Sequence, residues 1–192
     1  HPGGFHHNLQ SLRVVDVLEA TSSRRGMNLT AEVRDGIVNH TGSGRPFTLE
    51  GQVVKISDRV AYINHDIDDA LRSGVISMED IPKTALELFG YSHRERINNM
   101  VTDLIKNSDG REEISQSPQF REELNKLRTF MFSHVYKSGR VKREEDLAKV
   151  EVVISSLYNY FLRDPSRLPD DLRQVAEEDG ANEAVKDYIA GM

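Results

Sequence analysis

Residues 48–72 constrain the fold more than any other segment, because they are compatible with one uninterrupted helix of about seven turns at 3.6 residues per turn. Apolar residues recur along this segment at alternating steps of three and four, which places them in one stripe. This stripe is the predicted buried face of the helix. It consists of Val53, Ile56, Val60, Ile63, Ile67 and Ala70.

The same segment carries two carboxylates that flank a phenol. Asp58, Tyr62 and Asp66 are spaced four residues apart, and at roughly 100° per residue they drift only about 80° in total. All three therefore share one face, away from the apolar stripe. Such a face can bind a cation or a polyhydroxyl ligand, or it can be solvated surface. Spacing alone favours the solvated surface, because charged residues mostly lie outside.

Length and composition are typical of a soluble helical protein. The 192 residues suffice for one sizeable core or slightly more, with 38% hydrophobic and 29% charged residues. No apolar run approaches the roughly 18 residues of a membrane span, and no signal-peptide pattern opens the chain. We therefore expect a cytoplasmic protein without a membrane segment. Both ends look cut, which predicts that the chain is part of a longer protein.

Cysteine is absent, which excludes disulfides and thiolate metal sites. The net charge of −6 argues against a broad nucleic-acid surface, although the basic pair Arg24-Arg25 leaves an accessory contact open. Nucleic acid therefore stays an uncertain partner.

Start and stop signals predict an all-α fold of eight or nine helices, without strand pairs. Asn8, Thr30 and Thr48 are placed to begin helices. Ser77–Asp80 and Ser92–Glu95 resemble capping boxes, and Ser117-Pro118 is a typical helix start. The predicted helices span approximately 8–21, 31–40, 48–72, 77–89, 92–106, 117–137, 143–162, 169–179 and 182–192.

Histidines offer weaker indications of chemistry. None lies in a zinc signature, and the doublet His65-Asp66 is too short to identify a site by itself. His7 lies near a predicted helix start, where an imidazole could meet a phosphate, but an ordinary exposed histidine is the favoured interpretation. Gly42-Ser43-Gly44-Arg45 lacks the spacing and the lysine of a phosphate-binding loop. These residues alone indicate a helical domain with a possible oxygen-rich site.

Several segments, taken together and in order, resemble the dGTPase-like deoxynucleoside triphosphate triphosphohydrolases of the HD-domain superfamily. The matching segments are 5–15, 27–41, 48–54 with 58–69, 127–136 and 185–192. The resemblance implies an HD-domain-like helical bundle portion followed by phosphohydrolase-associated helices. On this basis residues 1–90 would be the C-terminal part of an HD-type catalytic domain, and residues 91–192 the phosphohydrolase-associated region.

The resemblance also implies an activity. Enzymes of this family convert a dNTP to the deoxynucleoside and tripolyphosphate, with dGTP as the expected substrate here. A divalent metal ion such as Mg²⁺ or Mn²⁺ activates the water that attacks the α-phosphorus, and cationic groups offset the triphosphate charge. A homo-oligomer is the expected assembly.

Site residues follow from the motif match. Asp58 resembles the last metal ligand of the family, and the neighbouring Arg59 resembles a phosphate contact. Tyr62 and Asp66 fall where the family binds the sugar, and a carboxylate that accepts from the 3′-hydroxyl helps to prefer deoxynucleotides.

Three further positions match less central parts of the family pattern. His7 corresponds to a catalytic histidine near the α-phosphate, a candidate proton donor to the leaving oxygen. Arg128 and Tyr136 resemble phosphate- and nucleoside-contacting positions.

The metal ligands are incomplete, because the family's first His and its His-Asp doublet have no counterpart in these 192 residues. His65-Asp66 belongs to the block around Asp58 and is not that doublet. A single carboxylate holds a metal poorly, so we predict that this chain alone neither binds metal tightly nor hydrolyses dNTPs. The alternative is a non-catalytic helical regulatory or interaction module on the same scaffold.

Overall fold

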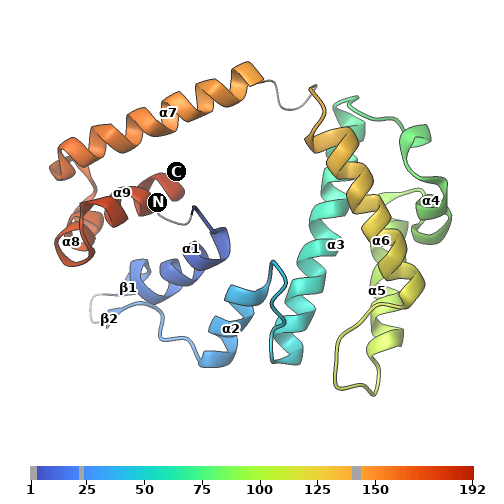
Figure 1. The fold of residues 1–192 in the computed structure, drawn as a ribbon. Helices are drawn as coiled ribbons and strands as arrows, with labels where there is room; N and C mark the ends of the chain where they lie inside the picture. Colours follow the sequence, from blue (N-terminus) through green and yellow to red (C-terminus); the bar gives the residue numbers. More distant parts are fainter. Residues whose placement is uncertain (1–3, 22–23, 140–143) are drawn as a thin grey trace. The chain divides into compact units, whose positions relative to one another are not determined.

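The computed structural model describes residues 4–21, 24–139 and 144–192, and it confirms the predicted all-α class. The chain forms two compact units, His1–Ser138 and Gly139–Met192 (Figure 1). The predicted boundary between family domains at residues 90 and 91 concerns a different kind of division and stays a prediction. None of the helices in the described ranges is both long and apolar enough to cross a membrane.

The first unit contains six α-helices and one short strand pair among its described residues. Short helical turns extend or connect these elements: the π-helical turns Val14–Leu18 and Phe132–Tyr136 and the 3-10 turn Met78–Asp80. The main elements are α1 His7–Arg13, β1 Ala20–Thr21, β2 Arg24–Arg25, α2 Ala31–Asn39, α3 Leu49–Arg72, α4 Lys83–Phe89, α5 His93–Ser108 and α6 Pro118–Met131.

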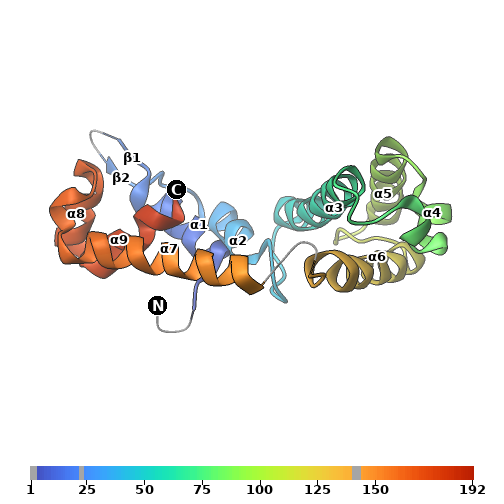
Figure 2. The same cartoon turned by 90° about the horizontal axis from the view of Figure 1, so that it is seen from above.

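Helix α3 is the centre of the first unit. It begins after Thr48, whose Oγ1 accepts a hydrogen bond from the Gly51 N–H at 3.1 Å. Figure 2 shows α3, α5 and α6 side by side, with α4 against α5 and α6. The core between these helices contains Val60, Ile63, Ile67, Ala70, Ile76, Ile81, Ala85, Leu86, Phe89, Met100, Leu124, Leu127, Met131 and Val135.

The predicted apolar stripe of α3 is confirmed over its second half and wrong at its beginning. Val60, Ile63 and Ile67 are buried, but Val53 is 41% exposed. Ile56 is only partly buried against the core. The α3 residues of the buried core cluster begin at Val60, so the neighbouring helices cover mainly the second half of the stripe.

The expectation of no strand pair was wrong. Ala20 pairs with Arg25 and Thr21 with Arg24 in a two-residue antiparallel ladder. A strand is recognised in a sequence by alternation over about four to eight residues. A pairing of two residues is too short to give that signal.

The predicted N-cap at Asn8 was also wrong. The helix starts at His7, and the Asn8 side chain instead donates a hydrogen bond to the Val38 carbonyl at 2.7 Å. This bond joins α1 to the end of α2, a tertiary contact that capping rules do not include.

One predicted helix is two. The segment 77–89 contains the expected capping box of Ser77 and Asp80, but α4 begins only at Lys83. Ile81 is extended before Pro82, as expected for a residue that precedes proline. The capping box of Ser92 and Glu95 and the Ser117-Pro118 start are confirmed.

A buried polar network fixes α5 against α3. The Arg96 Nε donates to Asn64 Oδ1 at 2.9 Å, and its Nη2 lies 2.5 Å from Asp68 Oδ1. His93 Nδ1 lies 2.5 Å from the other Asp68 oxygen. The network therefore holds in place the helix that carries most of the predicted site.

The second unit contains α7 Glu144–Arg163, a 3-10 turn Pro165–Arg167, α8 Asp170–Asp179 and α9 Ala181–Ala190. Phe161 of α7 packs edge-on against Tyr188 of α9, with ring centroids 4.9 Å apart. Ala184 and Val185 are fully buried in the same unit. None of the predicted site residues lies in this unit.

Candidate functional site

Helix α3 presents three of the predicted site residues on successive turns. Because α3 is continuous from Leu49 to Arg72, Asp58, Tyr62 and Asp66 lie along one side of it. Asp58 is exposed, whereas Tyr62 and Asp66 are half-buried. Tyr62 packs against the core of the unit. The face is therefore exposed to solvent at Asp58 and half-buried at Tyr62 and Asp66.

Tertiary folding brings Tyr136 to this face. Its hydroxyl donates a hydrogen bond to Asp66 Oδ2, although the two residues are 70 positions apart. Tyr136 lies in the π-helical turn that follows α6, and such turns occur frequently at functional sites. Burial raises the pKa of Tyr136, and the hydrogen bond to Asp66 and the nearby charge raise it further. The phenol therefore stays protonated and keeps donating to the carboxylate.

Asp66, Tyr62 and Tyr136 together can recognise the hydroxyl groups of a ligand. Asp66 supplies a carboxylate acceptor, while Tyr62 and Tyr136 supply two phenol hydroxyls that donate and accept. The half-buried position of all three side chains strengthens their hydrogen bonds relative to those in water. The arrangement suits a polyhydroxyl ligand such as a sugar.

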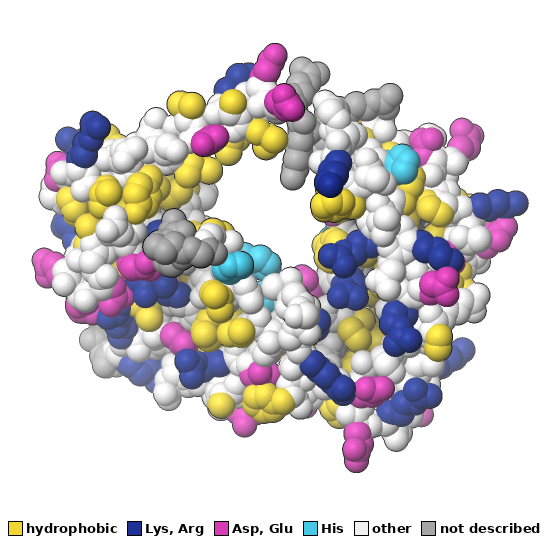
Figure 3. Space-filling view, viewed as in Figure 1, with side chains coloured by type: hydrophobic (Ala, Val, Ile, Leu, Met, Phe, Trp, Pro, Cys, Tyr) yellow, Lys and Arg dark blue, Asp and Glu magenta, His cyan; other side chains and the backbone are white. Residues whose placement is uncertain are grey.

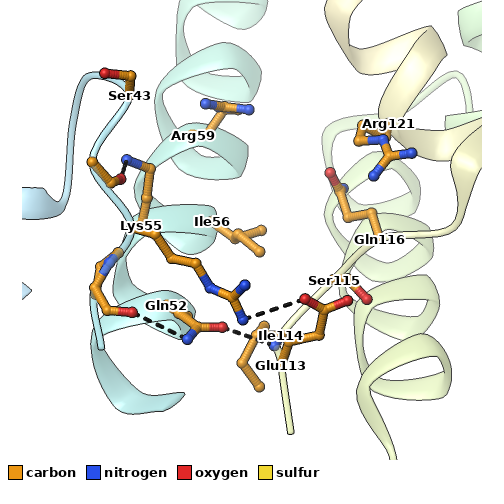
Figure 4. Close-up of a pocket in the computed structure, with 13 residues that line it drawn as sticks. Ser43, Gln52, Lys55, Ile56, Arg59, Glu113, Ile114, Ser115, Gln116 and Arg121 are labelled. Carbon is orange, nitrogen blue, oxygen red and sulfur yellow. Dashed lines mark hydrogen bonds and ion pairs between the residues drawn. The ribbon is translucent and has the colours of Figure 1, made fainter. Parts of the chain in front are cut away.

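Arg59 belongs to a different side of α3, where it lines a cavity of about 330 Å³ (Figure 4). Lys55 lines the same cavity, and its Nζ donates to the carbonyls of Asn39, Gly42 and Gly44 at 3.0, 2.9 and 2.6 Å. Burial lowers the pKa of Lys55, and the nearby positive charge of Arg59 lowers it further. Figure 3 shows several basic side chains, with acidic ones among them, along the α3–α6 part of this unit.

His7 and Arg128 are not brought to the Asp66–Tyr136 pair by any contact among the described residues. His7 is exposed at the start of α1, and its ring lies edge-on to that of His40, with 5.1 Å between centroids. Arg128 is exposed and lines a separate cavity of about 420 Å³ with Asn125, Thr129 and Phe132.

The donors present do not fit a tightly bound divalent metal. Among the residues with described positions, no group of three or more His, Asp or Glu side chains converges to hold an ion. Asp58 is a single carboxylate, whereas metal sites use three or more protein ligands or several oxygen donors.

Sequence reasoning missed two residues that the structure places near Arg59. Gln116 and Arg121 line the same cavity from the connection between α5 and α6 and from the first turn of α6. They lie more than 50 positions from Arg59 in the sequence, and neither belongs to a recognisable motif. No sequence signal was available to find them.

Comparison with known proteins shows which family the chain resembles. The model of the phosphohydrolase-associated domain matches residues 114–192. A deoxyguanosinetriphosphate triphosphohydrolase-like protein of Caldanaerobacter subterraneus subsp. tengcongensis is 49% identical over 190 residues, which cover 99% of this chain and 55% of that protein. This chain belongs to the dGTPase-like family.

Other proteins with the same description are similar to this chain along nearly its whole length. The protein of Clostridium tetani is 40% identical over 202 residues, covering 100% of this chain and 57% of the relative. The protein of Bordetella parapertussis is 34% identical over 240 residues, covering 99% and 62%. The chain thus spans somewhat more than half the length of the curated relatives it matches.

Proposed function

We propose that this chain supplies the sugar- and phosphate-contacting part of a triphosphohydrolase that converts a dNTP, with dGTP as the first candidate, to deoxynucleoside and tripolyphosphate. The observation that carries the proposal is the hydrogen bond between Tyr136 and Asp66, with Tyr62 one turn away on α3. The descriptions of the relatives as deoxyguanosinetriphosphate triphosphohydrolase-like support the class of reaction.

The chain's residues would act mainly by positioning the substrate. Asp66 accepts a hydrogen bond from the 3′-hydroxyl, and the protonated phenol of Tyr136 keeps that carboxylate oriented. Tyr62 bounds the sugar on the same side. Arg59, adjacent to Asp58 on α3, offsets phosphate charge, which grows on the phosphoryl oxygens in the transition state. His7 is the candidate donor of the proton that the leaving oxygen needs.

The chain by itself is expected to be inactive. Asp58 alone does not make a metal site, and it belongs to no group of three or more His, Asp or Glu donors among the described residues. We therefore expect neither tight manganese binding nor dGTP hydrolysis by these 192 residues. Micromolar manganese affinity in a calorimetric titration, or measurable turnover, would contradict this expectation.

A chimeric enzyme tests the proposal directly. The segment of the Caldanaerobacter relative that aligns with this chain is replaced by this chain, and the unmodified relative sets the reference rate. Chromatography then follows the release of deoxyguanosine and tripolyphosphate from dGTP. The chimera should hydrolyse dGTP, and Asp58→Ala in it should abolish turnover while leaving the helical content unchanged.

Asp66→Ala in the same chimera isolates the sugar contact. Loss of a hydrogen bond to a charged group costs about 1.5–3 kcal/mol, so kcat/KM for dGTP should fall by roughly 10- to 150-fold. Asp69→Ala is the matched control, because Asp69 is an exposed carboxylate of α3 whose ion pair is with Arg72. An Asp66→Ala chimera with undiminished kcat/KM would refute the assignment.

A non-catalytic interaction module is the second candidate. The observation that favours it is the lack of a three-ligand group among the described side chains. A folded chimera that binds dGTP but does not hydrolyse it, beside an active parent enzyme, would favour the module over the enzyme.

A further inference from the structure

The cavity beside Arg59 has walls that are held together by one buried side chain. Gln52 of α3 donates from Nε2 to the Pro46 carbonyl at 3.1 Å and accepts at Oε1 from the Ile114 N–H at 3.1 Å. It therefore joins the segment before α3 to the connection between α5 and α6. Figure 4 shows the space between these walls, with Arg59 on one side and Gln116 and Arg121 on the other.

Positive charge dominates this cavity. Its lining contains Arg45, Lys55, Arg59 and Arg121 and a single carboxylate, Glu113. That carboxylate lies 3.3 Å from the Arg45 guanidinium, while backbone carbonyls hold the Lys55 ammonium. Within the described ranges, Arg59 and Arg121 have no carboxylate partner.

A buried hydrogen-bond donor lines the same space. The Nε2 of Gln116 is inaccessible to solvent and has no hydrogen-bond partner among the described groups. A buried donor left unpaired is costly, and native proteins rarely keep one without a reason. Gln116 immediately precedes Ser117, the N-cap of the 14-residue α6, where the helix dipole favours an anion. The Gln116 amide, the Arg121 guanidinium and the N-terminal end of α6 therefore all favour an anion in this cavity.

We infer that this cavity binds a polyphosphate anion, with Gln116 Nε2 and the guanidiniums of Arg59 and Arg121 as donors. Guanidinium groups match phosphate oxygens in geometry and charge. A volume of about 330 Å³ is at the low end for small-molecule sites. Among the described residues, no aromatic side chain lines the cavity to stack on a base, which favours a phosphate chain over a whole nucleoside.

The inference rests in part on the proposed function, because Arg59 is assigned there to the substrate's phosphate, and it goes beyond that function by adding Gln116 and Arg121 as phosphate donors. Tripolyphosphate binding by this chain and dGTP turnover by the chimera are separate measurements, so the failure of one is distinguishable from the failure of the other. Asp58, Tyr62, Asp66 and Tyr136 do not line this cavity. A polyphosphate could bind here whether or not the chain takes part in dNTP hydrolysis.

Isothermal titration calorimetry of the 192-residue chain with tripolyphosphate, without added metal, tests the inference. Arg121→Ala and Gln116→Glu should each weaken binding by about tenfold or more, because each removes a donor to a charged oxygen. Gln116→Glu keeps the size of the side chain but replaces the amide donor with a carboxylate. Arg94→Ala is the control, since Arg94 is an exposed arginine of α5 outside the cavity, and its affinity should stay within roughly twofold of the parent chain.

Three results would overturn the inference: no tripolyphosphate binding at millimolar concentration, an unchanged affinity in Arg121→Ala, or an equal loss in Arg94→Ala. Orthophosphate that binds as tightly as tripolyphosphate would overturn the assignment to a polyphosphate. Circular dichroism establishes that each variant is folded. Should Gln116→Glu fail to fold, the comparison of Arg121→Ala with Arg94→Ala still decides the outcome.

Discussion

Replacing Arg96 with methionine should destabilise the first unit by about 3 kcal/mol. Arg96 is 2% exposed and joins α5 to two residues of α3, Asn64 and Asp68. Methionine fills similar space but donates no hydrogen bond. The substitution therefore leaves the Asn64 amide oxygen, which lies at a fully buried position, without its partner. It also removes the guanidinium that pairs with the Asp68 carboxylate.

The expected loss of stability depends on how many of the polar contacts among Arg96, Asn64 and Asp68 remain after the substitution. Removing one partner of a buried ion pair typically costs about 3–5 kcal/mol. The Asp68 side chain is 30% exposed, so water still solvates the carboxylate and the lower end of that range applies. Since domains are stable by roughly 5–15 kcal/mol, such a loss is a large fraction of the total. For a unit of this size it corresponds to a fall in Tm of about 10 °C.

Urea denaturation followed by circular dichroism measures the loss, and hydrogen exchange of peptides from α3 and α5 shows where it acts. Arg94→Ala, an exposed arginine on the same helix, should change stability by less than about 0.5 kcal/mol. Arg96→Met combined with Asn64→Leu should cost less than the sum of the single changes, because both unpaired groups are then absent. A loss below about 1 kcal/mol for Arg96→Met would refute the reasoning.

Three further predictions concern single positions, each measured as a change in the free energy of unfolding in urea. Tyr136→Phe removes the donor to Asp66 and should cost about 1.5 kcal/mol; an unchanged free energy would show that the bond contributes nothing. Hydrogen bonds from a lysine and a threonine lower the pKa of Glu123 below its ordinary 4.5, so its contribution is present above that value and is lost as pH falls through the lowered pKa. Glu123→Gln should therefore flatten the fall in stability between about pH 5 and 3, and an unaltered slope would contradict this. Gly26→Ala should cost at least about 2 kcal/mol, because φ is +73° and a Cβ would overlap a backbone carbonyl of the preceding π-helical turn; Gly42→Ala, at φ +69° in open space, should cost only about 1 kcal/mol.

Helix starts and the second half of the long apolar stripe could be predicted, because they depend on neighbouring residues. Thr48, Ser92 and Ser117 cap the helices that follow them through bonds to backbone groups three positions on. The family pattern likewise lies in short ordered segments, and the comparisons confirm the membership it implies. Such signals are local, so the amino-acid sequence by itself determined the helical class and the family.

Contacts across the chain could not be predicted in this way. Val53 continues the stripe but lies outside the covered part of α3, and only the placement of the other helices decides that. The bond between Asp66 and Tyr136 joins positions 70 apart. The cavity of Gln116 and Arg121 exists because Gln52 ties two distant segments together. Local patterns specify helices and their faces, whereas the tertiary structure alone decided which side chains meet, because those distances depend on packing.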